Sequence, residues 1–154
     1  MFRRSLAYGK KHEATLDTFF GRNWTITPLT LNQERAGLGD RQFCRDGDKY
    51  LIEYKSDETA SRTGNAFIET VSVDTTDKPG WAITCKADFI FYYLPLDNLI
   101  YVISPETIRA NLKLWQNKYQ TVPTGKGKND GYRTWGIKLP LYELEQAASK
   151  VISV

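Results

Sequence analysis

The sequence predicts a mixed α/β domain, and three features of the chain indicate that class. Apolar side chains recur at helical spacing within residues 5–20, and a well-capped second helix is expected in the C-terminal third. The dipeptide Asp46-Gly47 accepts the positive φ angles of a type I′ turn and marks a β-hairpin. Two short apolar runs, 89–94 and 99–103, are typical of strands. Together they exclude an all-α and an all-β fold.

The first half of the chain is expected to begin with the amphipathic helix at residues 5–20, which Gly21 ends as a C′ glycine. Residues 24–31 are expected to be extended, and Pro28 restricts that segment to a sheet edge or a bend. The hairpin then occupies residues 40–56.

Beyond the hairpin, the polar residues 56–64 are expected to form a loop, and residues 66–73 alternate as a third strand. A short helix or turn is expected at residues 81–87, before the two apolar strands. Ser104 is a good N-cap and is followed by proline, so the second helix is expected to begin there. A helical stretch at residues 141–152 is expected to end the chain.

The composition is that of one globular domain of 154 residues, with 41% hydrophobic residues and no internal repeat. No apolar run approaches the ~18 residues that a membrane span needs, and no signal peptide is visible. Two cysteines are too few for a disulfide scaffold. We therefore expect a cytoplasmic protein with no membrane partner.

Charge is unevenly distributed along the chain. Residues 41–80 carry six basic and eight acidic side chains, whereas residues 111–154 carry seven basic and three acidic ones. An acidic centre beside a basic region suits a metal site next to a phosphate-binding surface, although many proteins that bind no nucleic acid share this pattern.

Several catalytic chemistries lack the residues that they need. The single histidine, His12, cannot build a two-histidine metal site, and no Gly-x-Ser-x-Gly motif is present to pair with it. Neither a Walker-type loop nor a Gly-x-Gly-x-x-Gly motif occurs, so no nucleotide cofactor is expected. Chemistry based on carboxylates and a lysine remains.

The hairpin brings such residues together. If Asp46 and Gly47 form the loop, Asp40 lies opposite Glu53, and Lys55 leaves the strand on the same side as Glu53. Opposed carboxylates repel, and a hard divalent ion such as Mg²⁺ with a lysine beside it relieves that repulsion. The alternative is a plain surface hairpin with a salt bridge. The other face of the strand carries an apolar row for the core: Tyr50, Ile52 and Tyr54.

Asp40 followed by Glu53-x-Lys55 resembles the core of the PD-(D/E)XK nucleases, the restriction-endonuclease-like superfamily. Gly39 stands where that pattern has a proline, a position that varies in the superfamily. The resemblance implies a restriction-endonuclease-like mixed central sheet flanked by helices. It also implies Mg²⁺-dependent DNA cleavage, with Asp40 and Glu53 as metal ligands and Lys55 as a catalytic residue.

Glu13 lies on the apolar stripe of the first helix, where a carboxylate is costly unless it is satisfied. Many of these nucleases place a first-helix glutamate near the metal, so the resemblance implies a catalytic and metal-site role for Glu13. The alternative is a boundary residue that pairs with a neighbour such as Lys10.

The segments TGNAFIE (63–69) and KPGWAITCKADF (78–89) resemble paired stretches in small phage-type and intron-type nucleases of this superfamily, although the residues after the proline depart in part from their Ser-Gly. The resemblance implies a metal-site role for Glu69, with a solvent-facing strand carboxylate as the alternative. It implies that Trp81 and Lys86 face DNA, with ordinary packing as the alternative. These relatives include site-specific homing endonucleases.

The loop 123–136 is basic, glycine-rich and longer than ordinary connections. Its cations Lys126, Lys128 and Arg133 are expected to contact DNA phosphates or base edges, and a solvated hairpin loop is the alternative. The basic region of about residues 105–154 is therefore expected to serve DNA binding and oligomerisation.

These expectations combine into a Mg²⁺-dependent endonuclease for double-stranded DNA, with one or two ions per site and Mn²⁺ as a substitute. One chain supplies one site, so a homo-oligomer, a dimer or higher, is expected. The alternatives are a junction-resolving or repair nuclease and a non-catalytic DNA-binding module on the same fold. Aromatic residues expected to contribute to the subunit contact are Trp115, Tyr119, Tyr132, Trp135 and Tyr142.

Overall fold

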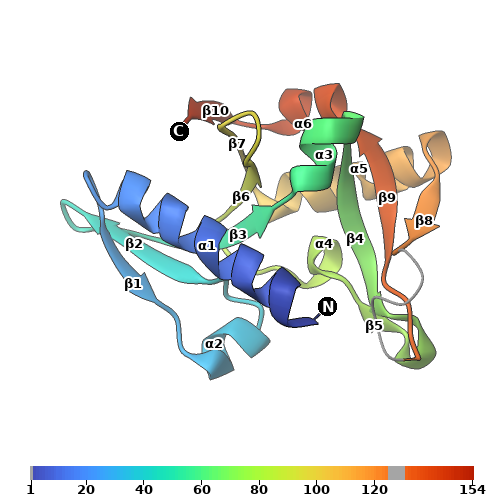
Figure 1. Ribbon diagram of the computed structural model, residues 1–154, viewed down its shortest axis with the longest axis horizontal. Helices are drawn as coiled ribbons and strands as arrows, with labels where there is room; N and C mark the ends of the chain where they lie inside the picture. Colours follow the sequence, from blue (N-terminus) through green and yellow to red (C-terminus); the bar gives the residue numbers. More distant parts are fainter. Residues whose placement is uncertain (1, 125–130) are drawn as a thin grey trace.

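The computed structural model describes residues 2–124 and 131–154 (Figure 1). In chain order its helices and strands are α1 (Phe2–Phe20), β1 (Thr25–Pro28), α2 (Leu31–Arg35), β2 (Arg41–Arg45), β3 (Asp48–Ser56), α3 (Glu58–Thr63), β4 (Asn65–Val73), η1 (Asp74–Thr76), β5 (Lys78–Pro79), α4 (Trp81–Thr84), β6 (Phe89–Leu94), β7 (Leu99–Ile103), α5 (Pro105–Lys118), β8 (Thr121–Pro123), β9 (Trp135–Pro140), α6 (Leu141–Ala147) and β10 (Lys150–Ser153).

The strands form two sheets. The central sheet has six strands in the order β1-β2-β3-β6-β7-β10, and only its β3–β6 pair is parallel among the described strands. The second sheet has four strands in the order β5-β4-β9-β8, all antiparallel. The expected α/β fold with a mixed central sheet flanked by helices is confirmed at this level.

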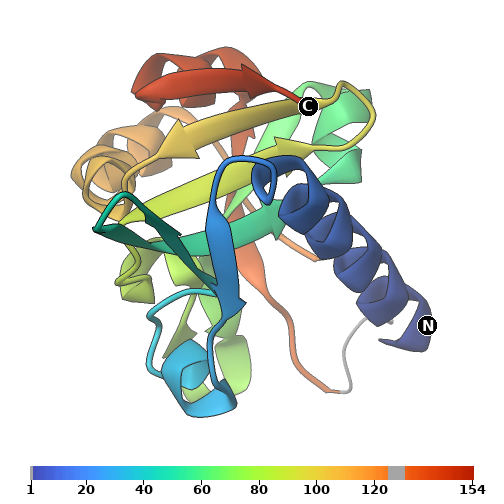
Figure 2. The same cartoon turned by 90° about the vertical axis from the view of Figure 1, so that its left-hand side faces the viewer.

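Two apolar clusters lie on opposite faces of the central sheet. Helix α1 crosses one face, where Leu16 and Phe20 pack with Phe91 of β6 (Figure 2). Ile90 and Tyr92, the neighbours of Phe91, belong to the other cluster, which includes side chains of α5, α6 and the four-stranded sheet. Strand β6 is therefore buried on both faces, which explains its uninterrupted apolar sequence.

The hairpin of β2 and β3 has the predicted register. Arg45 is the Cα partner of Asp48, and Arg41 is the partner of Ile52. The two turn residues have φ angles of 51° and 85°, as a type I′ turn requires. Because side chains alternate along β3, Ile52 faces α1 while Glu53 and Lys55 leave on the opposite side.

The expected loop at residues 56–64 is wrong, because α3 occupies most of it. Asp57 is the N-cap and accepts the Ala60 N–H at 2.8 Å, and Gly64 ends the helix at φ 74°. The segment was predicted as a loop because it is polar and its interior has little apolar periodicity. Its capping residues, and not its periodicity, specify where the helix begins and ends.

The expected C-terminal helix at residues 141–152 is only half correct. Helix α6 ends at Ala147, and residues 150–153 form β10, which pairs antiparallel with β7. The sequence interpretation also missed β8 and β9 at the two ends of the loop 123–136. Strand β9 pairs with β4, and its alternate residues Ile137 and Leu139 have no solvent exposure.

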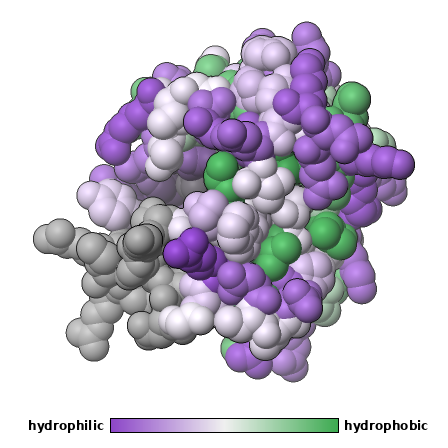
Figure 3. Space-filling model, turned by 90° about the vertical axis from the view of Figure 1, so that its right-hand side faces the viewer, coloured by the Kyte–Doolittle hydropathy of each residue, from purple (hydrophilic) through white to green (hydrophobic). Residues whose placement is uncertain are grey.

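Trp115 is buried in the core, and its indole N–H donates to Glu143 Oε2 at 3.0 Å. It is therefore not among the aromatic residues that a subunit contact can use, whereas Tyr142 is exposed. Within the described residues, no helix combines the length and the apolar character that crossing a bilayer requires. Figure 3 shows small groups of apolar side chains between hydrophilic ones, which is ordinary for a protein surface.

Candidate active site

Asp40 lies at the open end of the hairpin, one residue before β2 begins. Its backbone N–H donates to the Ile52 carbonyl at 2.8 Å, so it is still attached to β3. Its carboxylate Oδ2 accepts the Tyr54 N–H at 2.7 Å. A side chain thus replaces the backbone acceptor that a longer β2 would supply, and it places the carboxylate beside the next residues of β3.

The backbone at Gly39 excludes a proline. Its φ angle is +110°, which a proline ring cannot adopt because the ring fixes φ near −65°. A Cβ at this position would lie 2.7 Å from the Ile52 carbonyl oxygen, so the close approach also excludes alanine. The glycine at this position therefore follows from the local backbone.

Glu53 and Lys55 lie on one side of β3, as predicted. The Lys55 Nζ is 2.7 Å from Glu53 Oε1, and the two side chains are 30% and 15% exposed. Burial lowers the pKa of Lys55, but attraction by Glu53, with smaller contributions from Asp40 and Glu69, outweighs burial and raises it. Lys55 is therefore an ammonium that neutralises a group of carboxylates.

Asp40 and Glu53 repel each other electrostatically. The pKa of Asp40 is raised, first by burial and then by the charge of Glu53, although the Tyr54 N–H and Lys55 oppose the shift. A raised carboxyl pKa means that the environment disfavours the anion. Additional positive charge at this place would therefore be favourable.

Glu69 comes from β4 of the second sheet and approaches the same lysine. Burial raises its pKa, while Lys55 and the Trp81 backbone N–H oppose that effect. A Cβ at residue 80 would lie 2.4 Å from the Glu69 carbonyl oxygen, so only glycine lets the chain cross β4 this closely. Gly80 thereby places Trp81 against the site, where Lys55 Nζ lies 5.8 Å from the centre of the indole ring.

Glu53, Lys55 and Glu69 line an open cleft of about 940 Å³. Trp81 and Lys86, which were expected to face DNA, line the same cleft, and Lys86 is exposed. Other cationic side chains in its lining are Arg35, Lys78 and Arg109. The cleft thus joins a group of carboxylates to a set of cations from several elements.

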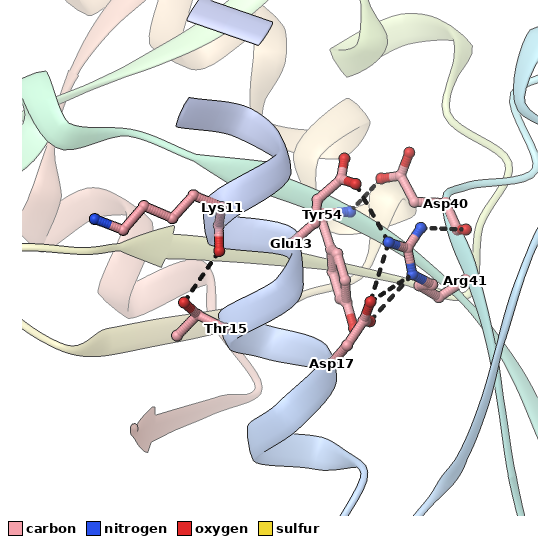
Figure 4. A network of polar contacts seen from close by, with 7 residues as sticks. All are labelled: Lys11, Glu13, Thr15, Asp17, Asp40, Arg41 and Tyr54. Carbon is pink, nitrogen blue, oxygen red and sulfur yellow. Dashed lines mark hydrogen bonds and ion pairs between the residues drawn. The ribbon is translucent and has the colours of Figure 1, made fainter. Parts of the chain in front are cut away.

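Glu13 is tied to the hairpin. Its Oε2 accepts from Arg41 Nη2 at 3.2 Å, so its partner is Arg41 and not the neighbouring Lys10 (Figure 4). Arg41 also binds Asp17 and the carbonyl oxygen of Asp40. Whether Glu13 reaches a metal ion therefore stays a prediction.

Three further residues near the site were not identified from the sequence: Asp17, Glu34 and Arg41. The pKa of Glu34, which lines the cleft, is raised first by burial and then by Asp40 and Glu13. A usable signal was the spacing of Asp17, which lies one helical turn after Glu13 on the same face of α1.

Of the three cations in the loop 123–136 that were predicted to contact DNA, the structure describes only Arg133. Lys126 and Lys128 lie outside the described residues. Arg133 is exposed, its backbone N–H donates to Asp74 Oδ1 at 2.9 Å, and its side chain is not part of the cleft lining.

Carboxylate oxygens are the donors that a small hard cation such as Mg²⁺ prefers. Within residues 2–124 and 131–154, no group of three or more His, Cys, Asp or Glu side chains is arranged to hold a metal ion. Mg²⁺ keeps several waters and binds through one or two carboxylates plus substrate phosphates, so a protein pair is sufficient. The Tyr54 N–H binds Oδ2 of Asp40, and Lys55 lies against Oε1 of Glu53. Each carboxylate has a second oxygen besides the one in that contact.

Comparisons of the chain with protein-family models, with curated proteins and with solved structures find no match. The interpretation of the site therefore depends on its own residues and geometry.

Proposed function

We propose that this protein is a Mg²⁺-dependent DNA endonuclease of the PD-(D/E)XK type. The observation that carries the proposal is the place of Lys55, which lies 2.7 Å from Glu53 and is also attracted by Asp40 and Glu69. A lysine among carboxylates at the end of a hairpin is the arrangement that the superfamily resemblance implies. The mixed central sheet with flanking helices supports the proposal.

Asp40 and Glu53 would hold the ion, with Mn²⁺ as a substitute. A bound divalent ion supplies positive charge to the scissile phosphate and lowers the pKa of a coordinated water. The chain contributes fixed geometry: Asp40 is held at its backbone N–H by Ile52 and at its carboxylate by Tyr54. A carboxylate restrained at two points needs little reorganisation to bind a cation.

Lys55 acts in this proposal as a cation. Because its pKa is raised, it keeps its proton at neutral pH and is poorly suited to take one from water. It orients the attacking water and stabilises negative charge that develops on the phosphate. Its contact with Glu53 fixes the ammonium on the same side of β3 as the carboxylates.

Double-stranded DNA is the proposed substrate. The cations of the cleft lining, Lys78 and Lys86 among them, supply contacts for phosphates, and Trp81 supplies an aromatic surface beside Lys55. Site-specific, homing-type cleavage comes from the resemblance. One chain contributes one Asp40–Glu53–Lys55 set, so we also propose a homo-oligomer that presents one site to each strand.

The deciding experiment is nicking of supercoiled plasmid by purified protein with Mg²⁺, with Mn²⁺ or with EDTA. We expect metal-dependent cleavage in the wild type and none in Glu53→Gln. Stronger cleavage of branched junctions than of plasmid would favour the junction-resolving alternative. DNA binding without cleavage under every metal condition would favour the non-catalytic module, and light scattering with and without DNA tests the oligomer.

A further inference from the structure

A buried arginine contacts Asp40, one of the two proposed metal ligands. Arg41, which is 9% exposed, donates from Nη1 to the carbonyl oxygen of Asp40 at 3.0 Å. Its Nε donates to both carboxylate oxygens of Asp17 at 3.1 and 3.2 Å, and its Nη2 donates to Asp17 Oδ2 and to Glu13 Oε2 at 3.1 and 3.2 Å. One guanidinium therefore joins the hairpin end to two carboxylates of α1 (Figure 4).

Tyr54 closes the network from the opposite side. Its hydroxyl donates to Asp17 Oδ1 at 3.0 Å, and its backbone N–H donates to Asp40 Oδ2 at 2.7 Å. The guanidinium carbon of Arg41 lies 5.4 Å from the centre of the Tyr54 ring. Asp40 is thus held at its carbonyl by Arg41 and at its carboxylate by Tyr54, and both of these residues bind Asp17.

We propose that Arg41 is a positioning residue that, together with Asp17, sets the geometry of the metal-binding carboxylates. This inference rests on the proposed function, because it assigns Asp40 to metal binding. Arg41 has no direct contact with Glu53 or Lys55 among the described interactions, so it acts through Asp40 and Glu13.

The chemistry of the guanidinium explains why arginine occupies this place. Its planar fork presents five N–H donors, and here three of its nitrogens serve Asp40, Asp17 and Glu13 at once. A lysine keeps the charge, but its three donors all leave from one nitrogen. It therefore lacks the spaced, planar donors with which Nε, Nη1 and Nη2 of arginine reach Asp17, Asp40 and Glu13. Burial alone would lower the pKa of Arg41, but Asp17 and Glu13 outweigh it, and the pKa is raised.

The network also links α1 to the hairpin through polar contacts. Apolar packing of Leu16 and Phe20 holds α1 against the sheet, but such contacts do not fix a carboxylate direction. The Arg41 bonds to Glu13 and Asp17 provide the directional part of the attachment. Replacing the Arg41 guanidinium should therefore leave Asp40 and Glu13 less well fixed while the fold stays intact.

The test compares Arg41→Lys with Arg45→Lys, the same change at the other end of β2. Arg45 is exposed, and its guanidinium lies 3.9 Å from the centre of the Trp24 ring. We expect Arg41→Lys to weaken Mn²⁺ binding by about tenfold, which is the usual effect of losing a residue that hydrogen-bonds a metal ligand. Arg45→Lys should leave the affinity unchanged. Calorimetry measures both affinities. In metal-free protein, we expect hydrogen exchange of the Tyr54 amide to be about tenfold faster in Arg41→Lys, because its acceptor Asp40 is less well fixed.

Tyr54→Phe keeps the backbone N–H and removes only the bond to Asp17, so it serves if Arg41→Lys does not fold. We expect it to weaken Mn²⁺ binding by a smaller factor, roughly threefold, within the range of a single hydrogen bond. A folded Arg41→Lys with unchanged Mn²⁺ affinity and unchanged Tyr54 amide exchange would overturn the proposal. If the wild type bound no divalent ion, the proposed function would fail, and the amide exchange would still decide whether Arg41 positions Asp40.

Discussion

The carboxylate of Asp40 accepts the backbone N–H of Tyr54 at 2.7 Å, so a side chain completes the hydrogen bonding of β3 after β2 has ended. This bond turns Asp40 toward the residues that follow in β3 and brings it close enough to Glu53 for their charges to interact. A strand end and a candidate metal ligand are therefore formed by the same contact.

Asp40→Asn is expected to slow cleavage by at least ~100-fold, because it removes a proposed metal ligand and not merely a residue that contacts one. Without metal, the same variant is expected to be more stable than the wild type at neutral pH. The folded-state pKa of Asp40 is raised above its ordinary value of 3.8, first by burial and then by Glu53. The wild type therefore loses stability as pH rises from that value through the raised pKa, and the amide variant does not. Plasmid nicking and thermal unfolding without metal, between pH 4 and 8, measure both effects.

Asp48→Asn, at the exposed turn of the same hairpin, is the control for Asp40→Asn and should change neither quantity. Full activity in Asp40→Asn would remove Asp40 from the metal site. A melting temperature that is lower than the wild type at pH 7 and equal to it at pH 4 would contradict the assigned direction of the pKa shift.

Lys55→Ala is expected to abolish cleavage, whereas Lys49→Ala is expected to be nearly silent. Lys55 neutralises Glu53 within the cleft, while Lys49 is exposed beside the turn. Loss of Lys55 also leaves the carboxylates unpaired, so unfolding should be easier by roughly 1–2 kcal/mol, a value reduced from that of a buried pair because the lysine is 30% exposed. Chemical denaturation and nicking give the two readouts, and equal effects of the two variants would show that the motif is assigned to the wrong lysine.

Much of this site was predictable because one local signal determines it. Asp46-Gly47 specifies a two-residue turn, and the turn sets a register that ends with Arg41 opposite Ile52. Asp40 comes directly before Arg41 and is close enough to Glu53 for their charges to interact. The alternation of side chains along a strand then puts Lys55 on the same side. All of these steps use neighbours in sequence or in one hairpin.

The contacts that the sequence did not reveal join distant segments. Arg41 binds Asp17 across 24 positions, and nothing in the pattern of β2 distinguishes it from the exposed Arg45. The short helix α3 and the strands β8 to β10 were missed because caps and sheet pairing, and not periodicity, specify them. Tertiary pairing decides such short segments, so single-sequence patterns are weak there.

Divalent ions are expected to stabilise the folded protein through Glu53. An ion that binds only the folded state at about 100 times its Kd adds ~2.7 kcal/mol to the free energy of unfolding. Denaturant unfolding with Mn²⁺ and with EDTA measures the difference. Glu53→Gln should abolish it, because one of the two proposed ligands is gone. Equal stabilisation in wild type and Glu53→Gln would place the ion elsewhere.

Gly39→Pro is expected to destabilise the protein by about 3 kcal/mol or more. The φ angle of +110° and the 2.7 Å approach to the Ile52 carbonyl both exclude a ring at this position. Gly9→Ala is the contrasting change, since a Cβ there meets no atom within 4 Å and alanine favours the helix, so stability should rise by about 0.5–1 kcal/mol. Urea unfolding compares the two, and a Gly39→Pro variant as stable as the wild type would contradict the observed backbone.

Phosphate contacts in the cleft are expected to dominate DNA binding. The double variant Lys78→Ala and Lys86→Ala removes two cations of the cleft lining, so the slope of log affinity against log salt should fall by about 1.8, since each phosphate contact contributes about 0.9. The pair Lys126→Ala and Lys128→Ala tests the basic loop in the same way, and Lys113→Ala on α5, outside the cleft lining, is the control. Fluorescence anisotropy with a labelled duplex at several salt concentrations gives the slopes. An unchanged slope for the Lys78 and Lys86 pair, beside a reduced slope for the loop pair, would move the DNA away from the cleft and onto the C-terminal region.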